Sequence, residues 1–98
     1  MSAYLIVMIN VTDRDRYQEY MNASPGVTAE FGGRFIARGG ETIVLEGQEQ
    51  AQRIVLIEFP SLEQVKAFYH SDAYQEIKKL REGAASGTFI AVDGVQSA

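Results

Sequence analysis

Two hydrophobic stretches of this chain are apolar at consecutive positions rather than at alternate ones. Residues 4–11 read YLIVMINV, and residues 53–59 read RIVLIEF. A strand with one face in water alternates apolar and polar residues, whereas a strand that is covered on both faces does not. Both stretches are therefore predicted to be strands whose two faces are covered.

A first helical pattern follows Asp13, whose side chain is suited to cap a helix. The spacing of apolar and aromatic residues predicts a helix over residues 14–23. Pro25-Gly26 is expected to interrupt it, and a second short helical piece is expected to reach Phe31. The Gly32-Gly33 pair is expected to supply the left-handed C-terminal cap.

A second helical pattern begins at a capping box formed by Ser61 and Gln64. Its apolar stripe pauses at His70, and Ser71 or Asp72 is suited to cap a second helical segment there. The helical region is therefore predicted to consist of two segments that follow one another.

The end of the chain returns to a strand pattern. Residues 83–87 contain two glycines and are expected to close the helical region. Residues 88–94 are predicted to form the last strand, and residues 95–98 are expected to fray.

Two glycine pairs bracket residues 34–38, which are predicted to form a short strand. Residues 41–46, which read ETIVLE, are predicted to be a strand as well. Between them, Gly39-Gly40 could form a two-residue hairpin turn or a bulge that bends one long strand. The bulge is favoured because residues 34–38 make a short hairpin arm. At least one of the two glycines is expected to have a positive φ.

This order of elements is β-α-β-β-α-β, the ferredoxin-like arrangement of the α+β class, with a four-stranded antiparallel sheet. The two helices of this arrangement can cover only one face of the sheet, so the second face would expose several hundred Å² of apolar surface, which monomers rarely tolerate. A second copy packed across a two-fold axis would cover it. The sequence therefore predicts a homodimer.

Composition limits the range of partners and locations. The 98 residues are expected to form a single domain, 1–98. A net charge of −4 argues against a nucleic-acid partner, and the absence of cysteine excludes disulfides and thiolate metal sites. The N-terminal apolar run is too short for a signal peptide or a membrane span. We therefore expect a soluble, unprocessed protein of the cytoplasm.

Five short motifs are spread over almost the whole chain: VTD at 11–13, Y-x-x-Y at 17–20, GGRFIARGG at 32–40, EFPSL at 58–62 and FYHS-x-x-Y at 68–74. With them the chain resembles the bacterial proteins of domain of unknown function family 1330. That family is similar in fold to the dimeric α/β-barrel superfamily, which includes cofactor-independent monooxygenases, muconolactone isomerases and haem-dependent relatives. The resemblance implies a homodimer whose two sheets close into a barrel.

Glu58 and Arg38 are candidates for chemistry. Glu58 is the acid of an otherwise apolar strand, so desolvation could raise its pKa and make it a general acid or base. Alternatively it emerges into solvent, or Arg38 or Arg53 pairs with it in a structural role. Arg38 could orient a carboxylate or phosphate with its planar guanidinium, or serve as the partner of Glu58.

His70 is the one histidine, and it could act as a general base, as a haem ligand of the kind used by haem-dependent relatives, or as a solvated capping residue. Four tyrosines are expected to point from the helices toward the sheet. They are either core residues or hydroxyl groups that line a ligand pocket. These four are Tyr17, Tyr20, Tyr69 and Tyr74. Asn10 and Asp93, near strand ends, are further binding candidates.

Two classes of function remain open. In the first, the protein is a cofactor-independent enzyme, monooxygenase-like or isomerase-like, that acts on a small aromatic or carbonyl-bearing metabolite. Arg38 would orient its anionic group, and Glu58 or His70 would move a proton. In the second, the homodimer binds a ligand without catalysis or serves as an accessory module. No cofactor or metal is expected in either class.

Overall fold

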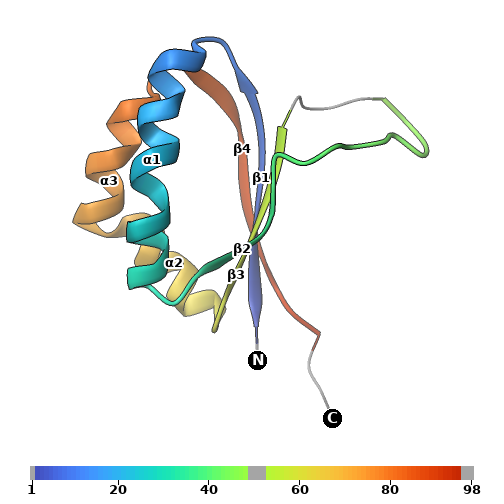
Figure 1. Cartoon of the computed structure of the whole chain (residues 1–98). Coiled ribbons are helices and arrows are strands. Elements are labelled where there is room, and N and C mark those ends of the chain that lie inside the picture. The colour runs from blue at the N-terminus through green and yellow to red at the C-terminus, as the bar shows by residue number, and fades with distance from the viewer. Residues whose placement is uncertain (1, 49–52, 96–98) are drawn as a thin grey trace.

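The computed structural model describes residues 2–48 and 53–95. All helices of this part lie on one side of a four-stranded antiparallel sheet with the order β2-β3-β1-β4 (Figure 1). The elements are β1 (Ala3–Val11), α1 (Arg14–Glu30), β2 (Arg34–Arg38), β3 (Arg53–Phe59), α2 (Leu62–His70), α3 (Asp72–Lys78), the 3-10 turn η1 (Lys79–Arg81) and β4 (Ala85–Asp93). The predicted ferredoxin-like order and fold class are confirmed.

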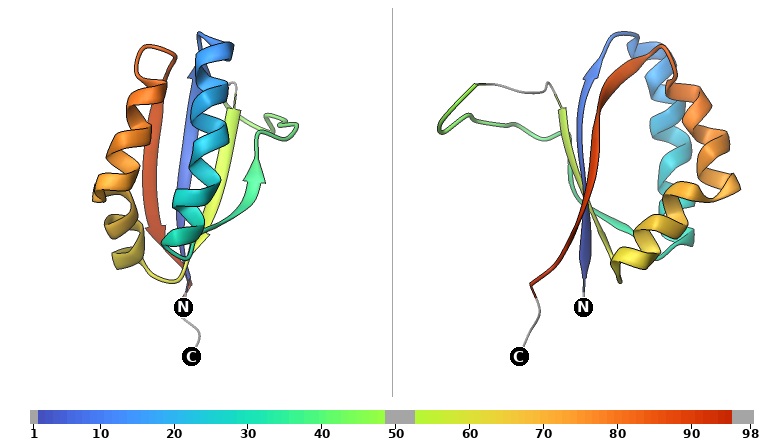
Figure 2. Two further views of the ribbon diagram at one scale, coloured as in Figure 1. Left: turned by 60° about the vertical axis from the view of Figure 1, so that its left-hand side comes forward. Right: turned by 180° about the vertical axis from the view of Figure 1, so that it is seen from behind.

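The two faces of the sheet differ in what covers them. Side chains on the inner face pack against the helices, and in β1 Leu5, Val7 and Ile9 are at most 4% exposed. The opposite side, here called the outer face, has none of the described helices against it (Figure 2). It carries half-buried Ile6, which lies between Leu56 of β3 and Ile90 of β4. The chain itself therefore covers only one of the two apolar faces that the sequence predicts.

Helix α1 corrects one prediction, because it runs unbroken through Pro25 to Glu30. Proline lacks the N–H that would bind the carbonyl of Met21 four residues earlier. Arg38 of β2 supplies a replacement donor, since its Nη2 lies 2.8 Å from that carbonyl oxygen. The helix continues because a side chain from the sheet satisfies the group that proline leaves unpaired.

The ends of α1 follow the sequence prediction. The Asp13 side chain accepts a hydrogen bond from the Arg16 amide at 3.1 Å. At the other end Gly32 has φ +80°, and the Gly33 amide donates to the Thr28 carbonyl at 2.9 Å. This is the glycine-capped helix end that the Gly32-Gly33 pair predicts.

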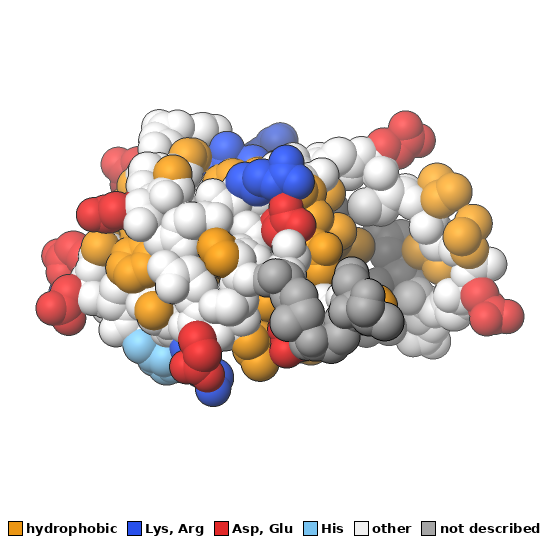
Figure 3. Space-filling view, turned by 90° about the horizontal axis from the view of Figure 1, so that it is seen from below, with side chains coloured by type: hydrophobic (Ala, Val, Ile, Leu, Met, Phe, Trp, Pro, Cys, Tyr) orange, Lys and Arg blue, Asp and Glu red, His pale blue; other side chains and the backbone are white. Residues whose placement is uncertain are grey.

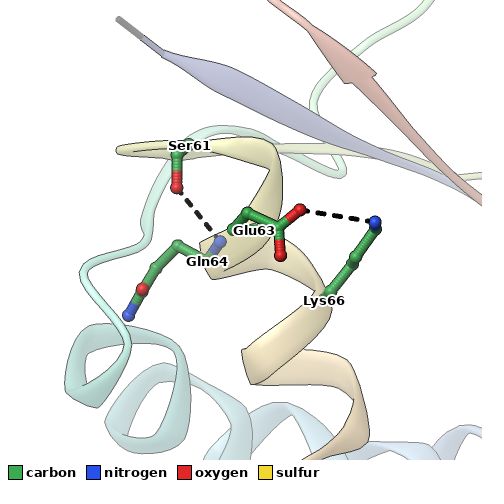
Figure 4. A network of polar contacts seen from close by, with 4 residues as sticks. All are labelled: Ser61, Glu63, Gln64 and Lys66. Atoms are coloured by element: carbon green, nitrogen blue, oxygen red, sulfur yellow. Dashed lines mark hydrogen bonds and ion pairs between the residues drawn. The ribbon is translucent and has the colours of Figure 1, made fainter.

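Both helix starts in the second helical region are also confirmed. Ser61 Oγ accepts a hydrogen bond from the Gln64 amide at 3.1 Å, and a Lys66–Glu63 ion pair lies beside it (Figure 4). Ser71 then caps α3 by accepting from the Tyr74 amide at 3.0 Å.

Strand β4 begins earlier than predicted, at Ala85 instead of Thr88. The glycine-containing segment belongs to the strand, because Gly87 pairs with Ile9 of β1. A β-carbon at Gly87 would overlap the Met8 carbonyl oxygen. This glycine therefore permits a close approach of two strands, whereas Gly83, with φ +77°, marks the turn.

The strand predicted over residues 41–46 is not present. Residues 40–48, here called the arm, contain no regular secondary structure and project from the sheet on the side away from the helices (Figures 1 and 2). Gly39 has φ +69° and turns the chain out of the sheet, which confirms the expected positive φ. The favoured bulge at Gly39-Gly40 is wrong, since the irregular pairing of β2 lies between Phe35 and Ala37. A strand needs a hydrogen-bonded neighbour, and the arm pairs with no strand among the described residues of its own sheet.

Substitution of Gly39 by alanine is expected to lower the free energy of unfolding by about 1–3 kcal/mol. The cause is the positive φ together with the Arg53 guanidinium, which a β-carbon at Gly39 would overlap. Gly40→Ala is the matched control, because open space surrounds its position. Urea unfolding of both variants checks this, and equal losses at the two positions would contradict it.

Candidate functional site

A narrow cavity lies between α1 and the inner face of the sheet. Tyr17, Tyr20, Ser24 and Thr28 line it from one face of the helix. Apolar side chains from the strands and from Phe68 complete the walls. The cavity volume is about 20 Å³, which suits a water molecule or one small functional group.

A wider cleft adjoins this cavity and shares Tyr17, Met21 and Arg53 with it. The cleft has a volume of about 950 Å³, and its described walls also include Arg14 and Gly39. Such a volume lies at the upper end of the range of about 300–1,000 Å³ that is usual for small-molecule sites. The wide cleft and the narrow cavity together define the candidate site.

Arg53 is the cation shared by both spaces. Its Nε is buried and has no hydrogen-bond partner among the described residues. The side-chain ion pairs of residues 2–48 and 53–95 do not include it; they are Arg34–Glu58, Lys66–Glu63 and Lys79–Glu76. A buried donor without a partner costs about 1–3 kcal/mol, so the site favours an incoming acceptor.

A chain of hydrogen-bonding side chains also reaches the cavity. The hydroxyl groups of Tyr20 and Tyr74 lie 2.8 Å apart, and Arg81 Nη2 donates to the Tyr74 hydroxyl at 3.2 Å. Burial raises the pKa of Tyr20, and burial also raises the pKa of Tyr17. Both phenols therefore stay protonated and can donate hydrogen bonds.

Arg38 lines the cavity but is already engaged. Its Nη2 donates to the Met21 carbonyl, and its guanidinium carbon lies 4.5 Å from the centre of the Phe35 ring. It does not pair with Glu58, contrary to one of the two expectations. The Arg53 guanidinium hydrogen-bonds the Tyr17 hydroxyl, but its Nε has no described partner, so Arg53 is the better placed of the two arginines for an anionic ligand.

Glu58 lies on the outer face, away from the cavity. Arg34 Nε lies 2.7 Å from its Oε1, and the side chain of Glu58 is 22% exposed. This hydrogen bond from Arg34 lowers the pKa of Glu58. Of the three interpretations, the structural ion pair therefore fits, with Arg34 in place of Arg38 or Arg53.

The lowered pKa of Glu58 predicts the sign of a pH effect. A carboxyl whose pKa falls on folding stabilises the protein above its unfolded pKa and loses that contribution as pH falls through the folded pKa. In an NMR titration, Glu58 of the folded protein is expected to titrate below the ordinary glutamate pKa and to shift upward in Arg34→Met. An unchanged titration in that variant would contradict the ion pair.

Tyr69 and His70 lie in a different place from Arg38. They line an open pocket between α2 and β4, with a volume of about 300 Å³, and their ring centres are 5.3 Å apart. Arg38, Glu58 and Tyr69 therefore do not converge in one cavity. Asn10, opposite Ser86, and Asp93, opposite Ala3, lie at the ends of their strands and are exposed.

Of the four tyrosines, three belong to the core. Tyr17, Tyr20 and Tyr74 are at most 8% exposed, whereas Tyr69 is half-buried. Sequence analysis missed the roles of Ser24 and Thr28, although the spacing of residues 17, 20, 24 and 28 places them on one helix face. Nothing in the local sequence distinguishes Arg53 from any other arginine at a strand start.

Solved structures show the same fold at low sequence identity. A protein of unknown function from Rhodopseudomonas palustris is 19% identical, with a TM-score of 0.77 over 98% of this chain and 84% of that chain. A dimeric ferredoxin-like protein of unknown function from Jannaschia sp. CCS1 is 19% identical, with a TM-score of 0.68 over 98% of this chain and 100% of that chain. SnoaB, a cofactor-independent oxygenase from Streptomyces nogalater, is 8% identical, with a TM-score of 0.66 over 98% of this chain and 95% of SnoaB.

At these identities the likeness concerns the fold alone. No curated protein matches the sequence. The family described as Domain of unknown function (DUF1330) matches residues 2–95. Among the described residues, no helix is both long and apolar enough to cross a membrane.

Proposed function

The chain belongs to this family of unknown function. We propose that it is a homodimer and that each subunit binds a small anionic metabolite in the cleft beside α1. The metabolite would carry a carboxylate or enolate oxygen on an aromatic or carbonyl-bearing body. Arg53 carries this proposal, because its side chain lines both the cavity and the cleft and its buried Nε is a donor without a described partner.

The walls of the site favour a flat, largely apolar ligand body. Tyr17 and Met21 line both the cleft and the cavity, and Phe35 lines the cavity. The cavity admits a single small group, so the body of the ligand would occupy the wider cleft. Its anionic group would then meet Arg53 where the two spaces join.

The homodimer rests on the uncovered outer face. Ile36, Ile90 and Val92 of this sheet are 44–47% exposed, and apolar surface of this kind usually marks an interface. The Jannaschia protein, which shares the fold, is described as dimeric. A second copy with the same outer face would give each sheet its second layer.

Catalysis is the narrower candidate, and Tyr20 supports it. The Tyr74 oxygen accepts a hydrogen bond from Arg81, and Tyr74 can donate its own hydrogen to Tyr20, which would leave the Tyr20 hydroxyl hydrogen for a ligand oxygen. Such a donor could stabilise an enolate, as a cofactor-independent oxygenase or isomerase would require. However, no Asp, Glu or His among the described residues lines the inner cavity, and the acid on the described wall of the cleft is the exposed Asp15. Binding is therefore the primary proposal.

A thermal-shift comparison of acids with their amides tests the binding proposal. Salicylate and phenylpyruvate should stabilise the wild type, by about 2.7 kcal/mol at 100 times Kd, whereas salicylamide should not. Arg53→Met should lose the effect and Arg53→Lys should keep part of it, because the positive charge remains. Arg34→Met, on the outer face, is the matched control and should respond like the wild type. Equal responses of Arg53→Met and the wild type would contradict the proposed site.

A further inference from the structure

The open pocket between α2 and β4 has no part in the proposed function and is here called the α2–β4 pocket. Its volume of about 300 Å³ lies at the lower end of the range that is usual for small-molecule sites. Its floor is apolar and consists of Leu5 of β1, Val65 of α2, and Phe89 and Ala91 of β4. Ala91 stands opposite Leu5 in the sheet. The pocket therefore offers a ligand apolar surface on the helix side of the sheet.

The rim of the α2–β4 pocket is suited to an anion, although the whole chain carries a net charge of −4. Lys66 and His70 both line the pocket, and a spacing of four residues places them on one face of α2. Figure 3 shows the histidine, in pale blue, at the surface of the molecule beside basic and acidic side chains. No Asp or Glu among the described residues lines the pocket.

Lys66 remains available to a ligand. Its Nζ lies 3.5 Å from the Glu63 carboxylate, and the two side chains are 62% and 85% exposed. An exposed ion pair of this kind contributes little to stability. A ligand anion at the rim can therefore compete for the lysine.

Two further cations approach the aromatic rings of the pocket. Lys78 Nζ lies 5.7 Å from the centre of the Tyr69 ring, and the guanidinium carbon of Arg81 lies 4.5 Å from the centre of the Phe89 ring. These contacts occupy one face of each ring and add positive charge beside the pocket. The rest of the floor is aliphatic. The pocket therefore favours an aliphatic ligand body over a flat ring that needs free ring faces for stacking.

We propose that the α2–β4 pocket is a second ligand site, which binds a free aliphatic monocarboxylate of about six carbons. The carboxylate would meet Lys66 and His70 at the rim, and the aliphatic chain would lie on the apolar floor. Arg53 does not line this pocket, and the described walls have only Leu5 and Phe89 in common with the inner cavity. The second site therefore stands independently of the anion site at Arg53.

An NMR titration of the wild-type protein with hexanoate tests the proposal. The signals of Val65, Tyr69 and Ala91 are expected to shift and to saturate. Hexanamide lacks the charge and should bind about fivefold more weakly, the ratio that an exposed ion pair can give. Each CH₂ group added between butanoate and hexanoate should strengthen binding about fourfold if it enters the pocket.

Two variants and a matched control locate the site. Lys66→Met should bind hexanoate and hexanamide equally. Lys79→Met is the control, because Lys79 is similarly exposed, at 66%, and also pairs with a glutamate three residues away, but does not line the pocket. It should keep the wild-type preference for hexanoate. Ala91→Phe should fill the pocket and abolish the shifts, and the exposed position of Ala91 allows the larger side chain.

Three results would overturn the second site. The first is hexanoate without effect on Val65 and Ala91 at millimolar concentration. The second is a preference for hexanoate over hexanamide that Lys66→Met retains. The third is a set of nuclear Overhauser effects between two copies at Val65 and Ala91, which would assign the pocket to contacts within the dimer. None of these results bears on the response of Arg53 to salicylate, so the two proposals fail separately.

Discussion

Ile6→Glu is expected to abolish both the dimer and the folded state at micromolar concentration. Ile6 lies at the centre of the outer face, directly between Leu56 and Ile90. In the proposed dimer a carboxylate there would be buried without a partner, and a second one would approach it across the two-fold axis. Uncompensated burial of this kind costs about 3–5 kcal/mol. An interface of this type buries upwards of about 2,000 Å², so folding and assembly should fail together.

Circular dichroism and sedimentation velocity of Ile6→Glu check this result. Ala67→Glu is the matched control, because it adds the same charge on an exposed position of α2. If the chain were a stable monomer, Ile6→Glu would be a substitution at a half-exposed position, with a change of about 0.5 kcal/mol. A folded Ile6→Glu variant with the mass of the wild type would contradict the interface.

Phe68→Ala is expected to cost about 3–5 kcal/mol of unfolding free energy. Phe68 is 2% exposed, and its ring centre lies 4.7 Å from that of Tyr74, 5.1 Å from that of Phe59 and 6.1 Å from that of Phe31. The substitution removes all three ring contacts and leaves a cavity between the helices and the sheet. Since domains are stable by only about 5–15 kcal/mol, this one change should remove much of the total.

Urea unfolding at fixed protein concentration measures the loss. Phe68→Leu retains an apolar side chain at this position and is expected to lose clearly less than Phe68→Ala. Phe31→Ala removes a ring that is only partly buried and should also cost less. A loss below about 1 kcal/mol for Phe68→Ala, within the range of an ordinary substitution, would show that this ring does not organise the core.

The sequence predicted those parts of the fold that depend only on residues close together in the chain. The caps at Asp13, Ser61 and Ser71 and the strand Arg53–Phe59 require only spacing and side-chain chemistry. The continuous α1 could not be predicted in this way, because a residue of β2 bonds the carbonyl that Pro25 leaves unpaired. The strand prediction for the arm failed for the opposite reason: its sequence is suited to a strand, but it pairs with none of the described strands of its own sheet.

The candidate site was predictable only in part. Helical spacing indicated that Tyr17 and Tyr20 face the sheet, and both line the cavity. The ion pair of Glu58 with Arg34 depends on the register of β2 against β3, where these residues stand opposite each other. Arg53 is a candidate ligand-binding residue because its Nε is buried and has no described hydrogen-bond partner, and only the folded structure reveals this.

The most direct test of the binding proposal is the NMR spectrum of the arginine side chains during titration with salicylate. Arg53 Nε is buried without a described partner, whereas Arg34 Nε already bonds Glu58 at 2.7 Å. The Nε–H signal of Arg53 is expected to shift and to exchange more slowly with water as salicylate is added, while that of Arg34 stays unchanged and salicylamide has no effect. If salicylate and phenylpyruvate both left the Arg53 signal unmoved at millimolar concentration, the cleft would not be the anion site proposed here.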